Sequence, residues 1–116
     1  MVVEDDADNL DSIVELLQEE GYDVLAARTG KEASERLAAA HPCAIVVDYL
    51  LPDTNGTELV RRWRREMKGP PVPVIFLTAT IDPIDSVGAP ILKKPIALAE
   101  FLEVLGRSCA GAPAPS

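Results

Sequence analysis

Short apolar runs with little polar interruption recur along the chain and limit the folds open to it. The clearest are CAIVV (Cys43–Val47) and VPVIFL (Val72–Leu77), and shorter runs lie at Val2–Val3 and Tyr22–Ala27. A strand with one face in water alternates polar and apolar residues, whereas a strand covered on both faces is apolar throughout. The runs therefore predict a sheet buried between two layers of helices.

Segments with helical spacing of apolar residues separate these runs. The apolar stripes fall within residues 10–17, 33–40, 59–67 and 98–105. Thr29 is expected to be the N-cap of the helix that carries the second stripe, and Gly21 is expected to end the helix that carries the first. With Ile91–Leu92 as a short fifth strand, this alternation predicts an α/β fold with a doubly wound, five-stranded parallel sheet.

One stretch does not follow the alternation. Residues 79–90, ATIDPIDSVGAP, occupy the place of a fourth helix but contain two prolines, one glycine and no helical stripe. At most one or two helical turns fit there, around Ile84–Val87. We expect the fourth helix to be shortened or absent.

Length and charge exclude several classes of protein. A chain of 116 residues suits one domain, which we place at residues 1–108, with the small and proline-rich residues 109–116 as a tail or linker. The net charge of −8 disfavours direct nucleic-acid binding. No apolar run reaches the roughly 18 residues of a membrane span, and no signal peptide follows Met1. We expect a cytoplasmic protein that does not bind membranes.

Two features have structural interpretations. Cys43 and Cys109 lack the spacing of a metal site, and Cys43 is interpreted as a small core residue. The basic cluster Arg61–Lys68 is interpreted as the solvated face of a helix whose stripe includes Trp63.

Polar residues follow the apolar runs where each strand is expected to end. Glu4 and Asp5 follow the first run, Asp48 the third, Thr78 the fourth, and Lys93–Lys94 the fifth. The carboxyl ends of parallel strands meet at one edge of the sheet, which is where such folds bind ligands. Alternatively, the first acidic cluster is a solvated helix start, and Asp6 and Asp8 are expected to cap that helix.

Three carboxylates brought together need a counter-charge, which a divalent cation supplies. Mg²⁺ prefers oxygen ligands. A carboxylate beside Mg²⁺, an ammonium and a hydroxyl is suited to phosphoryl transfer, with an aspartate able to act as the nucleophile.

These residues resemble the receiver domain of two-component response regulators. The matching stretches, which are in family order and spacing over about residues 2–107, are VVED, VVDYLLPDTNG, VIFLTA and LKKP. The resemblance implies a flavodoxin-like strand order of 2-1-3-4-5. It also implies a cis bond between Lys94 and Pro95.

The resemblance further implies a role for each site residue. Asp48 is expected to accept a phosphoryl group from a sensor histidine kinase or phosphotransfer protein, aided by Lys94 and Thr78. The implied Mg²⁺ ligands are Asp5, Asp48, Glu4 through water, and the backbone carbonyl of Leu50. The domain would signal to an effector domain or a downstream protein and would not be a metabolic enzyme.

The chain departs from the family pattern in three places. The fourth helix is disrupted, and Ile91 stands where the family usually has an aromatic residue that moves on activation. We therefore expect the phosphorylation chemistry to be kept and the conformational readout to be altered. Leu50 is apolar at a position where a polar side chain could orient water, so we expect a long-lived phosphorylated state.

Three other functions are alternatives to this interpretation. A haloacid dehalogenase-type phosphatase would need an aspartate at Leu50, and a flavodoxin-type flavin binder would need a phosphate loop where this chain has EDDAD. A receiver-like interaction module that is never phosphorylated is the remaining alternative. The five matched positions disfavour it, although the disrupted fourth helix is compatible with it.

Overall fold

The computed structural model describes residues 1–67, 72–80 and 83–109. Its five parallel strands form one sheet in the order β2-β1-β3-β4-β5. The strands are β1 (Val2–Val3), β2 (Ala26–Ala27), β3 (Ile45–Asp48), β4 (Val74–Thr78) and β5 (Ile91–Lys93). The helices are α1 (Ala7–Glu19), α2 (Gly30–Ala39), α3 (Gly56–Glu66) and α4 (Leu98–Cys109). The predicted doubly wound sheet and its order are confirmed.

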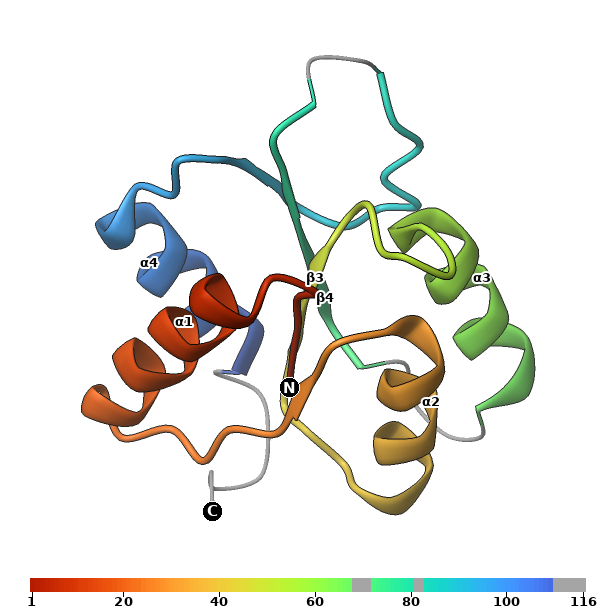
Figure 1. The fold of residues 1–116 in the computed structure, drawn as a ribbon, viewed down its shortest axis with the longest axis horizontal. Helices are drawn as coiled ribbons and strands as arrows, with labels where there is room; N and C mark the ends of the chain where they lie inside the picture. Colours follow the sequence, from red (N-terminus) through yellow and green to blue (C-terminus); the bar gives the residue numbers. More distant parts are fainter. Residues whose placement is uncertain (68–71, 81–82, 110–116) are drawn as a thin grey trace.

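Helices cover both faces of the sheet, with α1 and α4 on one side and α2 and α3 on the other (Figure 1). Alternate residues of each strand therefore enter different cores. In β3, Val46 packs with the α1/α4 side and Val47 with the α2/α3 side. In β4, Leu77 and Phe76 divide in the same way. Burial on both faces explains why these strands are apolar throughout.

Side-chain caps begin the first three helices. The side chains of Asp6, Thr29 and Asn55 accept hydrogen bonds from backbone N–H groups three residues later. Asp6 and Thr29 thus have their predicted capping roles. None of the helices in the described parts of the chain is long and apolar enough to cross a bilayer.

Strand β2 is shorter than the predicted Tyr22–Ala27. The amide of Tyr22 donates instead to the carbonyl of Leu17 at 3.0 Å, which closes the end of α1. Gly21 makes this turn possible because its φ of 91° lies in the left-handed region. The start of the apolar run therefore terminates a helix.

No helix forms among the described residues between β4 and β5, namely 79–80 and 83–90. The prediction that the fourth helix is shortened or absent is confirmed, and even the one or two turns that could fit around Ile84–Val87 do not form. Instead, Val87 and Gly88 form a turn with φ values of 48° and 86°. Contacts with α3 fix this segment, and local sequence does not reveal them.

The interpretation of Cys43 as simply a small core residue is wrong. Cys43 is half-buried and forms a disulfide with Cys109, which is 66 residues away in the sequence. The bond joins the segment before β3 to the last residue of α4. The rest of the predicted tail, residues 110–116, lies outside the described residues.

Candidate phosphoryl and metal site

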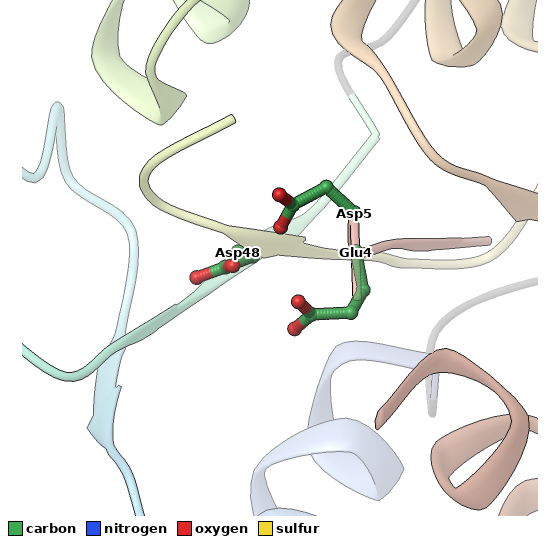
Figure 2. Close-up of side chains that lie close together, drawn as sticks. All are labelled: Glu4, Asp5 and Asp48. Atoms are coloured by element: carbon green, nitrogen blue, oxygen red, sulfur yellow. The ribbon is translucent and has the colours of Figure 1, made fainter. Parts of the chain in front are cut away.

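Three carboxylates meet at the carboxyl ends of β1 and β3. Glu4 and Asp5 follow β1, Asp48 ends β3, and Figure 2 shows their side chains together. One carboxylate oxygen from each residue lies within 4.8 Å of the other two. Adjacent parallel strands explain the convergence, since the register pairs Val3 with Val47 just before the acids.

Lys94 is the positive charge of this cluster. Its Nζ donates to Glu4 Oε2 at 3.0 Å and lies 3.4 Å from Asp48 Oδ1. Glu4 is only 1% exposed, and its other oxygen accepts a hydrogen bond from the amide of Asp6 at 3.2 Å. Lys93 is exposed while Lys94 faces the acids, as the strand period predicts. The Lys94–Pro95 bond is cis, as the resemblance implied.

The electrostatic balance of the cluster is incomplete. Burial, followed by the charge of Glu4, raises the pKa of Asp48 from 3.8 to about 6, although Lys94 acts in the opposite direction. Burial lowers the pKa of Lys94, but its hydrogen bond to Glu4 and the charge of Asp48 outweigh burial and raise it overall. One lysine therefore holds its proton firmly but does not neutralise three acids.

Thr78 is placed beside the cluster by the sheet. It ends β4, is 3% exposed, and its carbonyl accepts from the amide of Lys94 at 2.8 Å. Its hydroxyl accepts from the amide of Thr80 at 3.1 Å. Leu50 lies two residues beyond Asp48 and its side chain is turned outward, with 62% of the residue exposed.

Asp53 is a structural residue of the site that the sequence reasoning missed. Its carboxylate accepts hydrogen bonds from the amides of Gly30 and Lys31 at 2.9 and 3.0 Å, at the start of α2. Burial raises its pKa, but these two hydrogen bonds outweigh burial and lower it. Asp53 thereby ties the loop after Asp48 to α2. The turn sequence around Asp53 is a local signal for a loop, but nothing in the sequence indicates its hydrogen bond to the amide of Gly30, 23 residues away.

The donor set fits a hard divalent cation. The three converging groups offer carboxylate oxygens, which Mg²⁺ prefers, and burial together with the repulsion from Glu4 raises the pKa of Asp48. A cation among Glu4, Asp5 and Asp48 would relieve that repulsion and leave the ammonium of Lys94 available to a second anion.

Known proteins share this sequence pattern. The family of the response regulator receiver domain matches residues 1–105. The transcriptional regulatory protein PmrA of Pectobacterium parmentieri is 36% identical over 87% of this chain and 47% of its own length. An uncharacterized 14.6 kDa protein of Leptolyngbya boryana is 33% identical over 97% of this chain and 91% of its own length.

Solved structures share the fold. The signal receiver domain of a signal transduction histidine kinase from Syntrophus aciditrophicus has a TM-score of 0.85 at 29% identity, over 99% of this chain and 92% of that one. The non-phosphorylated HemR receiver domain from Leptospira biflexa has a TM-score of 0.77 at 31% identity, over 99% and 95%.

The chain spans about half the length of the first curated relatives, with 47% of PmrA and 46% of the response regulator MprA of Mycolicibacterium vanbaalenii covered. The matched region contains the converging carboxylates, Thr78 and Lys94. The chain therefore belongs to the response regulator receiver domain family.

Proposed function

We propose that Asp48 is the phosphoacceptor of a two-component system and receives its phosphoryl group from a sensor histidine kinase or phosphotransfer protein. The observation that carries the proposal is the convergence of Glu4, Asp5, Asp48 and Lys94 at one edge of the sheet. The domain acts as a regulated interaction module, and its own chemistry is limited to gaining and losing this phosphoryl group.

In the transfer, a carboxylate oxygen of Asp48 attacks the phosphorus of the donor, and the bond from phosphorus to the donor nitrogen or oxygen breaks. The leaving group takes the electron pair of that bond and a proton from water. Lys94 pairs with the phosphoryl oxygens, and the hydroxyl of Thr78 donates a hydrogen bond to one of them. Attack requires ionised Asp48, which the pKa of about 6 permits at neutral pH.

Glu4, Asp5, Asp48 and the carbonyl of Leu50 would hold Mg²⁺, with Glu4 acting through water. Bound Mg²⁺ would supply positive charge that neutralises the phosphoryl oxygens. Glu4 is well suited to an indirect role because Lys94 and the amide of Asp6 already occupy its two oxygens. Lys94 is 3.0 Å from Glu4 and 3.4 Å from Asp48, so a small movement would bring it to a phosphoryl group on Asp48.

We further propose that the domain acts in the cytoplasm and controls an effector domain or a downstream protein, without binding nucleic acid or membranes itself. PmrA is named as a transcriptional regulator, and bacterial DNA lies in the cytoplasm. Disulfides are uncommon in that compartment. Titration of the thiols of Cys43 and Cys109 in protein quenched directly from cells would show which form is present there.

Incubation with acetyl phosphate and Mg²⁺, followed by intact mass measurement, tests the main proposal. The wild type should gain one phosphoryl group, and Asp48→Asn should gain none. Asp11→Asn, which removes an exposed acid of α1 outside the cluster, is the matched control and should be phosphorylated normally. Chelation of Mg²⁺ should abolish the gain. An unmodified wild type would instead favour an interaction module that is never phosphorylated.

A further inference from the structure

The segment that replaces the fourth helix is held on α3 by polar contacts. The hydroxyl of Thr57 donates to the carbonyl of Asp85 at 2.6 Å, and Arg61 pairs with the carboxylate of Asp85, also at 2.6 Å. Arg64 donates to the carbonyl of Val87 at 2.7 Å. Ile84, Val87 and Ala89 pack against the core on the α2/α3 side. The position of this segment therefore depends on α3.

Thr57 also connects the segment to the acceptor strand. Its hydroxyl lies 2.7 Å from the hydroxyl of Tyr49, the residue after Asp48. A hydroxyl has one hydrogen, and a carbonyl can only accept. Thr57 must donate to Asp85, so Tyr49 must donate to Thr57. Thr57, at the middle of this directed chain of hydrogen bonds, is only 6% exposed, whereas Asp85 at its end is exposed.

Tyr49 has little freedom to move independently of the site. Its amide donates to the carbonyl of Leu77 at 2.8 Å, and its carbonyl accepts from the amide of Gly56 at 2.7 Å. Its ring meets that of Phe76 edge-on at 5.5 Å. A β-carbon at Gly56 would lie 2.7 Å from Phe76 and 3.0 Å from Tyr49. A displacement at Asp48 is therefore transmitted into the packing around Tyr49.

The far end of the chain of hydrogen bonds is strained. Val87 has a φ of 48°, a left-handed conformation that branched side chains avoid. Its amide donates to the Asp85 carboxylate at 3.0 Å, and its carbonyl is held by Arg64. A strained residue of this kind persists only while its surroundings fix it. Loosening Asp85 would therefore release Val87.

We infer that the hydrogen-bond chain from Tyr49 through Thr57 to Asp85 reports the phosphoryl state of Asp48 to residues 83–89. The inference rests on the proposed function and adds to it the segment, residues 83–89, that changes when Asp48 is phosphorylated. Tyr49 and Thr57 are positioning residues for the readout and do not take part in the transfer.

Amide hydrogen exchange of Val87, measured by NMR before and after treatment with acetyl phosphate and Mg²⁺, tests the inference. In the wild type, phosphorylation should speed this exchange by roughly threefold or more as the segment loosens. Changes should also appear at Tyr49 and along α3, and should be smaller in β5 and α4. Intact mass, measured in parallel, gives the phosphoryl content of every sample.

Matched variants show whether the hydrogen-bond chain from Tyr49 to Asp85 transmits the phosphoryl state of Asp48, as a relay, or only holds residues 83–89 in place. Thr57→Val keeps the shape and removes the hydroxyl, so phosphoryl incorporation should be normal while the exchange of Val87 no longer responds to it. Tyr49→Phe should behave in the same way, and Thr57→Ser should restore the response. Ser34→Ala removes a hydroxyl that accepts from Trp63 of α3 at 2.9 Å, outside the chain, and should respond normally.

The outcomes are distinguishable. A phosphorylated wild type with unchanged Val87 exchange, or a Thr57→Val variant that still responds fully, would overturn the relay alone. A wild type that takes no phosphoryl group would overturn the proposed function, and the relay would then have no phosphoryl group on Asp48 to report. The relay would be established if the amide exchange of Val87 responds to phosphorylation in the wild type and in Thr57→Ser but not in Thr57→Val or Tyr49→Phe.

Discussion

The two ends of the sheet differ in how they are stabilised. At the amino end, the Cys43–Cys109 disulfide joins the segment before β3 to α4. A groove of about 680 Å³ between α2, α3 and residues 88–90 is lined there by side chains that include Leu37, Val60 and Trp63. At the carboxyl end, buried Glu4 and half-buried Asp48 share one lysine. Proteins keep such unfavourable charge where function requires it. Substitutions at the amino end should therefore destabilise the fold, and neutralising Asp48 should stabilise it.

Reduction of the disulfide should have the largest effect. The bond closes a loop with a sequence separation of 66, and constraining an unfolded chain of that length contributes up to about 4 kcal/mol. Urea unfolding of the wild type with and without a dithiol reductant measures the difference. The Cys43→Ala/Cys109→Ala double variant should match the reduced protein and be insensitive to reductant. Equal free energies of unfolding for the oxidised and the reduced wild type would show that the disulfide does not stabilise the fold.

Leucine truncations compare the groove with the closed core between α1 and α4. Leu105→Ala in α4 should cost about 3 to 4 kcal/mol because it leaves a cavity among buried side chains. Leu37→Ala, which removes the same atoms beside the groove, should cost about 2 kcal/mol because water can enter the space. Urea unfolding of both variants checks the order. A larger cost for Leu37→Ala would mean that the groove is closed in solution.

Asp48→Asn should raise the free energy of unfolding at neutral pH. The folded-state pKa of about 6 exceeds the ordinary value of 3.8, so the folded wild type binds the proton more tightly and loses stability as pH rises between these values. Asparagine does not titrate. The variant's advantage should therefore be near zero below about pH 4 and rise to roughly 3 kcal/mol by about pH 7.

Urea titrations from pH 4 to 8 in metal-free buffer measure this difference. Added Mg²⁺ should reduce it, because the cation offsets the repulsion that the substitution removes. A variant less stable than the wild type at pH 7 without metal would show that Lys94 already balances the carboxylates.

The smallest effect is expected for the ion pair of Asp85 with Arg61. Both side chains are about half exposed, at 57% and 50%, so Asp85→Asn should cost less than about 1 kcal/mol. Glu103→Gln removes a more exposed pair with Arg107 on α4 and should cost still less. Thermal unfolding of the two variants compares them. A cost at Asp85 as large as that of Leu37→Ala would show that the segment supports the whole fold.

Much of this molecule follows from patterns that are local in sequence. The strands around Val47 and Phe76, the caps Asp6 and Thr29, and the disrupted fourth helix depend on residues a few positions apart. Because carboxyl ends of parallel strands meet at one edge, local patterns also brought Glu4, Asp5, Asp48 and Lys94 together.

Contacts between distant residues were decided only by tertiary packing. The sequence alone predicted neither the Cys43–Cys109 disulfide nor the Asp53 cap on α2. The contact of Thr57 with Asp85 was equally hidden, since it joins residues 28 positions apart. Periodicity and capping are set by neighbours along the chain. A contact between residues far apart in the sequence depends on how the helices pack on the sheet, and no pattern among neighbouring residues predicts it.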